Sequence, residues 1–310
     1  MQRTTQFGVF MAFLSAFTFS LATPINKLLL TDITPLALSG WTYLIAGAIL
    51  LPSFKVFKTG DRFHKKDIPK LSVCILSGGF AAPLCVLTGL TLVTAFQATL
   101  FLNSETVFTL ILALGIFHEK VKVKGWIGIV LILAILLLWS VNFNILNLSS
   151  AYSPGVLLIM LGCFFWGLDN NIDQKLSVKP PAQLTCIKGL SGGAISLLVS
   201  VLFSQQSAPT AMEWVGIVCL AFITFSISIV LFLLALKNAG TITTSSIFSI
   251  SPLMSSILTI FINGNIANAV DFAVLGVVLL GILLLIKDKQ ECNQPFACRF
   301  PSEEAVEKAV

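Results

Sequence analysis

The stretch WIGIVLILAILLLW at Trp126–Trp139 contains no charged residue, and FAVLGVVLLGILLLI at Phe272–Ile286 has the same character. A hydrocarbon layer about 30 Å thick requires roughly 20 apolar residues in a helix. Backbone groups in lipid must find their hydrogen bonds within the segment, so such runs form helices. The alternating short segments typical of a membrane β-barrel are not found in the sequence. Both stretches therefore predict transmembrane helices.

The rest of the chain has a similar composition. Of its 310 residues, 56% are hydrophobic and only 11% are charged, with a mean hydropathy of +0.95. Soluble domains carry about 25% charged residues. The predicted fold class is therefore an all-α integral membrane protein with ten transmembrane helices. The expected spans are 7–28, 35–54, 71–92, 96–117, 124–143, 153–174, 182–203, 213–236, 243–262 and 270–287.

Lysine and arginine gather on one side of this ten-span arrangement. The loop after span 2 carries Lys55, Lys58, Arg62, Lys65, Lys66 and Lys70, whereas the opposite loops 142–152, 204–212 and 263–269 carry none. Basic residues accumulate in cytoplasmic loops of membrane proteins. We therefore predict that both termini are cytoplasmic. The net charge of +5 is interpreted as a topology signal and not as a nucleic-acid surface.

The two halves of the chain resemble each other. GVFMAFLSAFTFSLATPINK from Gly8 aligns without gaps with GVLLIMLGCFFWGLDNNIDQ from Gly155. SETVFTLILALGIFHE from Ser104 aligns likewise with ISPLMSSILTIFINGN from Ile250, so the offset stays at 146 to 147 residues. Five spans per half is an odd number, which predicts inverted repeats with a binding site at their interface, where one half rocks against the other. The alternative is a rigid two-lobed protein. The expected domains are 1–145, 153–287 and a cytoplasmic tail at 288–310.

Several motifs together resemble the drug/metabolite transporter superfamily, in its EamA family of ten-span proteins. They are FFWGLDNNIDQKLS at 164–177, KGLSGG at 188–193, LNSETVFTLILALGIFHEKV at 102–121 and GTITTSSIFSISPLMSSIL at 240–258. The resemblance covers residues 7 to 287. The sequence departs from the family pattern at Thr106, where the family often has Pro, at Trp41 and Thr42, where it has a basic residue, and at Asn265, where it has Glu.

The resemblance implies a secondary transporter of a small metabolite, such as an amino acid or a related compound, with export favoured. It also implies an inner (plasma) membrane protein whose partners are a small-molecule substrate and the lipid bilayer; a homodimer is left open. No cofactor, metal or nucleic acid is expected. The sequence contains no GxxxxGK[ST] phosphate loop, and both histidines fall in predicted loops. The alternatives are a channel or a non-transporting membrane receptor, and, less favoured, a membrane-embedded enzyme.

Charged groups inside a membrane are costly, and they suggest functional sites. Glu105 falls about ten residues into span 4, roughly 15 Å deep at the helical rise, beside the polar Asn103. We predict a role in recognising a substrate amine or in proton coupling. The alternative is a carboxylate that only packs helices together. Ser251 is the counterpart of Glu105 in the second half and is a further candidate.

Asp169 and Asn170 form a second polar group near the cytoplasmic end of span 6. Asp173 lies one helical turn further on, and so shares a face with Asp169. Lys188 lies at a similar depth in span 7. We predict a buried ion pair between Asp169 and Lys188. The cluster either contacts the substrate or acts only as a structural clamp.

Aromatic residues within spans supply the remaining candidates. Trp41, Tyr43 and Trp166 each lie near small or polar residues, and are predicted to line a pocket. His118 and Glu119 follow span 4 and are predicted to act in gating or at an interface, or simply to end that helix. Lys27 near the outer end of span 1 is expected to extend toward the lipid headgroups.

Overall fold

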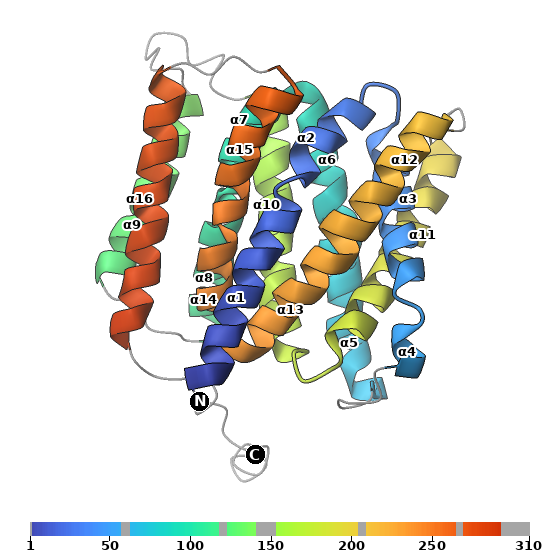
Figure 1. The fold of residues 1–310 in the computed structure, drawn as a ribbon, viewed down its shortest axis with the longest axis horizontal. Coiled ribbons are helices and arrows are strands. Elements are labelled where there is room, and N and C mark those ends of the chain that lie inside the picture. The colour runs from blue at the N-terminus through green and yellow to red at the C-terminus, as the bar shows by residue number, and fades with distance from the viewer. Residues whose placement is uncertain are drawn as a thin grey trace.

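The computed structural model describes residues 2–56, 63–117, 123–140, 153–203, 209–264 and 269–292, and all regular structure within them is helical (Figure 1). The elements are α1 (Gln2–Phe19), α2 (Ala22–Leu29), α3 (Pro35–Ile49), α4 (Ser53–Val56), η1 (Lys65–Asp67), α5 (Ile68–Cys74), η2 (Ile75–Ala81), α6 (Ala82–Leu92), α7 (Ala95–Leu102), α8 (Ser104–Phe117), α9 (Val123–Ser140), α10 (Pro154–Lys175), α11 (Pro181–Phe203), α12 (Ala211–Cys219), η4 (Leu220–Ile227), α13 (Ser228–Ala239), α14 (Thr241–Phe248), α15 (Ile250–Ile262) and α16 (Ala269–Cys292).

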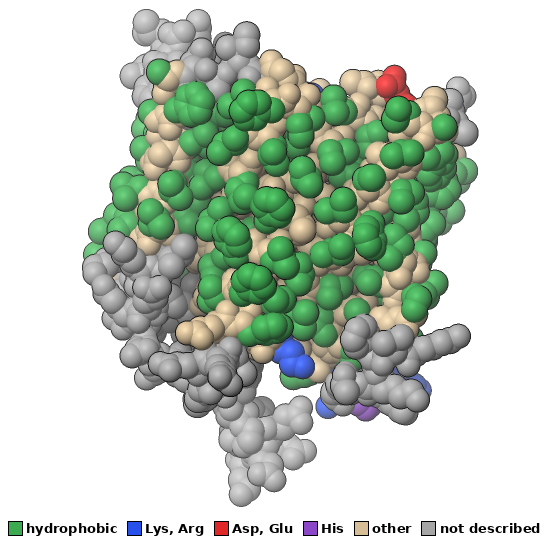
Figure 2. Space-filling view, viewed as in Figure 1, with side chains coloured by type: hydrophobic (Ala, Val, Ile, Leu, Met, Phe, Trp, Pro, Cys, Tyr) green, Lys and Arg blue, Asp and Glu red, His purple; other side chains and the backbone are tan. Residues whose placement is uncertain are grey.

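The predicted ten-helix membrane fold is confirmed. Within the described residues, seven helices are long and apolar enough to cross a membrane, and three shorter apolar helices occupy predicted spans 2, 5 and 10. Hydrophobic side chains cover the face seen in Figure 2, and charged side chains show only toward its upper and lower edges. The chain is a multi-pass membrane protein.

Side-chain caps fix where several helices begin. Helix α3 begins at Pro35. The hydroxyl of the preceding residue, Thr34, accepts a hydrogen bond from the Ala37 N–H and so caps the helix. Thr94 and Gln97 cap α7 reciprocally, each accepting a backbone N–H of the other at 3.1 Å. Such a reciprocal arrangement, called a capping box, satisfies backbone N–H donors that the first helical turn leaves without partners.

Several membrane-crossing segments are interrupted at equivalent places in the two halves. Predicted span 3 contains the π-helical segment η2, and predicted span 8 contains the π-helical segment η4. Predicted spans 4 and 9 are each broken in two, at Asn103 and at Ser249. These interruptions keep nearly the same offset as the two sequence alignments. The duplication therefore extends to local backbone geometry.

Contacts between helices show that the halves are inverted. On α1, Ser15 Oγ lies 3.1 Å from Ser228 Oγ of the antiparallel α13. The repeat partners of these two residues, Gly162 of α10 and Ala82 of α6, also meet: a Cβ on Gly162 would lie 2.9 Å from the Ala82 carbonyl oxygen. Helices α10 and α6 are likewise antiparallel. Helices α1 and α6 belong to the first and third spans of one half, so they cross the membrane in the same direction. Because α10 is antiparallel to α6, it also runs opposite to its repeat partner α1.

The most extensive helix contacts join one half to the other: α3 with α11, α1 with α13, α9 with α16 and α6 with α10. Glycines allow the closest approach, between α3 and α11. A Cβ on Gly193 would lie 2.8 Å from the Gly40 carbonyl oxygen, and Cys186 Sγ donates to the Gly47 carbonyl at 3.1 Å. The two halves are therefore interleaved.

The bundle has two ends. The terminal face is the lower end in Figure 1, where α1 begins and α16 ends, and the distal face is the upper end. Helix α10 ends at the terminal face, α11 begins there, and the turn at Gly240 (φ 79°) joins α13 to α14 there. Only glycine adopts such a φ readily.

Candidate functional site

A cavity opens between the two halves in the part of the bundle nearer the terminal face. The space inside it amounts to about 700 Å³ when the open space at its edge is counted. Both halves build this central cavity, through α1, α3, η2 and α8 and through α10, α11, η4, α13 and α14. Its lining residues are Phe19, Tyr43, Ala46, Gly78, Glu105, Trp166, Asp169, Asn170, Asp173, Thr185, Lys188, Gly189, Phe225, Ser228, Ile229, Phe232 and Phe248.

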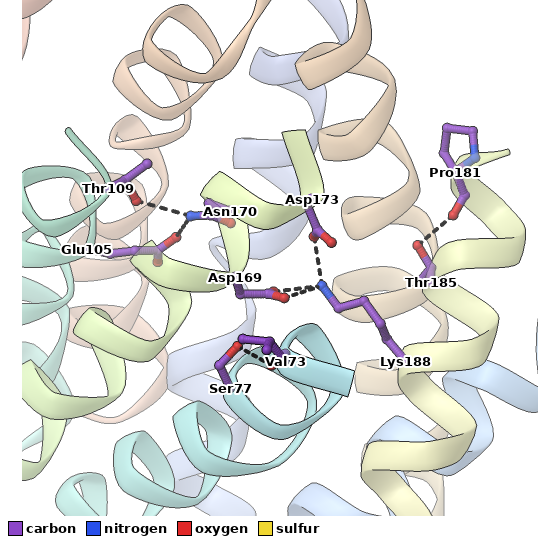
Figure 3. A network of polar contacts seen from close by, with 10 residues as sticks. All are labelled: Val73, Ser77, Glu105, Thr109, Asp169, Asn170, Asp173, Pro181, Thr185 and Lys188. Carbon is purple, nitrogen blue, oxygen red and sulfur yellow. Dashed lines mark hydrogen bonds and ion pairs between the residues drawn. The ribbon is translucent and has the colours of Figure 1, made fainter. Parts of the chain in front are cut away.

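A buried ion cluster forms one wall of the central cavity (Figure 3). Lys188 Nζ lies 2.8 and 2.6 Å from the two carboxylate oxygens of Asp169 and 2.7 Å from Asp173 Oδ2. All three side chains are buried. The predicted pairing of Asp169 with Lys188 is confirmed, and Asp173 completes it because it lies one turn along the same face of α10.

Gly78 makes room for this cluster. A Cβ at Gly78 would overlap the carboxylate of Asp169. Gly78 lies in the π-helical segment η2, so the backbone of predicted span 3 approaches the ion cluster directly. π-helical turns are frequent at functional sites, and here one brings a residue without a side chain against a buried charge.

Glu105 faces the same cavity with only neutral partners. It accepts a hydrogen bond from Asn170 Nδ2 at 2.9 Å, and the same amide donates to Thr109 Oγ1 at 3.2 Å (Figure 3). Among the described residues, no Lys or Arg pairs with Glu105. Glu105 therefore differs from Asp169 and Asp173, because its carboxylate accepts from a neutral amide, whereas they contact an ammonium group.

Aromatic rings cover much of the remaining wall. The ring centroids of Phe19 and Phe225 lie 6.0 Å apart, those of Tyr43 and Phe225 4.7 Å, and those of Phe232 and Phe248 4.9 Å. Aromatic faces attract cations within about 6 Å of the ring centroid. Rings beside an unpaired carboxylate make a site suited to a small cation with an apolar body.

The structure brings most of the predicted site residues together. Six of them line the central cavity: Tyr43, Glu105, Trp166, Asp169, Asn170 and Lys188. Among the others, Trp41 packs edge-on against Trp214 with centroids 5.0 Å apart, Asn103 Nδ2 donates to the backbone carbonyls of its own helix, and Ser251 is buried away from the lining. His118 and Glu119 lie outside the described residues.

Lys27 is placed differently from its prediction. Its Nζ donates to the carbonyls of Leu90 and Val93, both at 2.7 Å, instead of extending toward headgroups. These carbonyls lie at the C-terminal end of α6, where a helix leaves acceptors without partners and favours a cation. Lys27 therefore ties the first span to the end of the third.

Sequence reasoning missed the phenylalanines of the cavity. Phe19 had a usable signal, because the alignment of the halves pairs it with Trp166, which was predicted to line a pocket. Phe225, Phe232 and Phe248 carried no such signal among the 25 phenylalanines of an apolar chain.

One group of possible metal ligands occurs among the described residues, formed by Cys74, Asp169 and Asp173. Lys188 Nζ already occupies the position between the two carboxylates. An ammonium group therefore already contacts both carboxylates, and nothing in this arrangement calls for a metal ion.

A bundle of apolar helices around a cavity that holds buried charged side chains is the architecture of a membrane transport protein. The chain belongs to the EamA-like transporter family, whose model matches it twice, at residues 6–141 and 153–287. The predicted family is thus confirmed. The chain is a transporter and not an enzyme, which implies a small-molecule substrate and a membrane setting.

The proteins similar to this chain include one curated relative and one solved structure. An uncharacterized transporter of Methanothermobacter thermautotrophicus is 30% identical over 266 residues, which cover 79% of this chain and 76% of that protein. A solved structure described only as "Crystal structure of protein" superposes with a TM-score of 0.69 over 95% of this chain and 100% of that one, at 16% identity. The second likeness shows the fold alone.

Proposed function

We propose that this EamA-family transporter exports a small amine-bearing metabolite, such as an amino acid or a related compound, by alternating access at the seam between its two inverted halves. The observation that carries the proposal is the carboxylate of Glu105, which faces the central cavity with no cationic partner among the described residues. An ammonium group on the cargo supplies the missing charge, and the aromatic wall receives its apolar body.

The ion cluster and Glu105 have different roles in this proposal. Lys188 contacts both Asp169 and Asp173, so it links α10 to α11 and is already satisfied. Glu105 is then the acid that can exchange ligands. It binds either a proton or the cargo ammonium, which couples export of the amine to entry of a proton. Asn170 holds the carboxylate in one orientation through either state.

The setting of the protein in the membrane belongs to the same proposal. The basic loops support an inner (plasma) membrane protein with both termini cytoplasmic, so the terminal face is the cytoplasmic one. The central cavity then lies toward the cytoplasm, where cargo for export is collected. We take the functional halves to be 1–145 and 153–287, followed by a tail at 288–310.

Transport in proteoliposomes tests the proposal. Wild-type protein is assayed with a panel of radiolabelled amines and amino acids, with and without a pH gradient. Glu105→Gln keeps the shape of the side chain and removes its charge. The matched control is Glu213→Gln, because Glu213 caps α12 through the Thr210 N–H and glutamine caps equally well.

A hydrogen bond to a charged group contributes roughly 1.5–3 kcal/mol, so gradient-driven uptake should fall roughly tenfold to hundredfold in Glu105→Gln. The control should transport normally. No uptake of any panel member would refute the proposed cargo class. Flux that never saturates and ignores the gradient would indicate a channel, and gradient-driven uptake unchanged by Glu105→Gln would remove Glu105 from the mechanism.

A further inference from the structure

A second pocket lies between the central cavity and the distal face. This distal pocket encloses about 450 Å³, counting open space. Phe19, Tyr43, Trp166 and Phe225 line both spaces and therefore stand between them as an aromatic partition. The lining of the distal pocket is Phe19, Ala22, Thr23, Asn26, Ser39, Thr42, Tyr43, Pro83, Val86, Leu87, Leu90, Leu102, Trp166 and Phe225.

The distal pocket is the repeat-related counterpart of the central cavity. At the offset of 146 to 147 residues between the halves, most of its lining residues correspond to lining residues of the cavity. The corresponding pairs are Ala22 with Asp169, Thr23 with Asn170, Asn26 with Asp173, Ser39 with Thr185, Thr42 with Lys188, Pro83 with Ile229, Val86 with Phe232 and Leu102 with Phe248. Two unrelated voids would not share this register.

The two related pockets differ in charge. The positions of Asp169, Asp173 and Lys188 are neutral in the distal pocket, where Ala22, Asn26 and Thr42 take their places. Hydrogen-bonding capacity is nevertheless retained by Thr23, Asn26 and Thr42, all of them buried.

Thr42 points to a ligand. Its side chain is 2% exposed, and its hydroxyl has no hydrogen-bond partner in the part of the chain that the structure describes. Buried polar groups are normally satisfied by protein, water or ligand. A hydroxyl left without a protein partner on the wall of a pocket is available to a molecule that enters it.

We propose that the distal pocket is a second binding site for the same amine-bearing cargo, which it holds through the neutral polar groups of Asn26 and Thr42 and through the aromatic partition. This inference rests on the proposed function. Neutral hydrogen bonds are about half as strong as charge-assisted ones, so the distal site binds more weakly than the site at Glu105. The cargo passes from a charged site to a neutral one, from which it is released.

Equilibrium binding of tritiated phenylethylamine to the purified full-length protein in detergent micelles tests the proposal. This probe carries one ammonium group and one aromatic ring. The test variants are Thr42→Val and Asn26→Leu, which remove polar groups of the distal pocket. The matched control is Thr241→Val, because Thr241 is also buried without a partner among the described residues but lines neither pocket. Circular dichroism confirms that each variant is folded.

We expect two classes of site in the wild type. Thr42→Val and Asn26→Leu should each weaken the low-affinity class about tenfold, as loss of a buried hydrogen bond implies, and leave the high-affinity class within about twofold of the wild type. Glu105→Gln should weaken only the high-affinity class, and Thr241→Val should change neither.

A single class that saturates at one probe per chain would overturn the distal site. So would a low-affinity class that neither Thr42→Val nor Asn26→Leu changes, or no binding of the probe at all. If the high-affinity class is unaffected by Glu105→Gln while the low-affinity class responds to Thr42→Val, the distal site stands and the role proposed for Glu105 fails.

Discussion

Replacing Lys188 by methionine should destabilise the protein strongly. The substitution keeps most of the side-chain volume and removes the ammonium group that lies 2.6 to 2.8 Å from three carboxylate oxygens. It leaves Asp169 and Asp173, which are 6% and 2% exposed, without a counter-charge. Removing one partner of a buried ion pair costs about 3–5 kcal/mol, and two stranded carboxylates place Lys188→Met toward the upper end of this range.

Substituting other members of the ion cluster should lower the stability less than Lys188→Met does. In Asp169→Asn, Lys188 keeps its 2.7 Å contact with Asp173, so the loss should be about 1–3 kcal/mol, as for a single hydrogen-bonded charge. The neutral triple variant Lys188→Met, Asp169→Asn and Asp173→Asn strands no charge. It should recover most of the stability that Lys188→Met loses, because neighbouring effects of this kind are not additive.

Reversible unfolding in mixed detergent micelles, followed by circular dichroism, measures these differences. The matched control is Lys237→Met, since Lys237 is exposed near the end of α13 and pairs with no carboxylate among the described residues; it should leave stability unchanged. A loss below about 1 kcal/mol in Lys188→Met is what an exposed pair would give, and it would refute the buried cluster. So would a triple variant no more stable than Lys188→Met.

Two further substitutions test other contacts. Gly78→Ala adds a Cβ that would overlap the Asp169 carboxylate, so we expect lower stability in the same unfolding assay and loss of transport. The control Gly115→Ala places its Cβ in open space and should behave as the wild type. Equal behaviour of the two variants would contradict the close approach of η2 to Asp169. Asp67→Asn weakens the 2.8 Å ion pair that joins Asp67 to Lys179 of the other half. We expect added protease to cleave this variant faster near the terminal face. An unchanged cleavage rate would show that the ion pair does not hold the halves together there.

Much of the fold was predictable because the membrane reduces the choice to helices and marks each with a long apolar run. The repeat was readable for the same reason, since two alignments kept one offset. The interruptions were harder. Gly78 and Gly79 mark η2, but η4 has neither glycine nor proline, so local sequence gives no warning of its π-helical geometry. Packing against the rest of the bundle decides it.

The residues of the site were also predictable only in part. The charged residues of the cavity were found because charge within an apolar run is costly and therefore conspicuous. Direction was not predictable for aromatic residues: Trp41 and Tyr43 lie two positions apart on one helix, so they face different neighbours. Trp41 packs on Trp214, whereas Tyr43 reaches the cavity. Lys27 was wrongly assigned to the headgroups, because its carbonyl acceptors come from another span.

The interleaved packing of the halves has a consequence for how the molecule can move. Its four main helix pairs, such as α3 with α11, each combine a helix from one half with a helix from the other. Rotating one half as a rigid body would pull all four pairs apart, including the glycine contacts that leave no space between backbones. Sliding intact mixed pairs past one another avoids this, with η2, η4, Asn103 and Ser249 as the natural joints. We therefore expect the moving body to contain helices of both repeats, in place of the rocking of one half against the other that the duplication alone predicts.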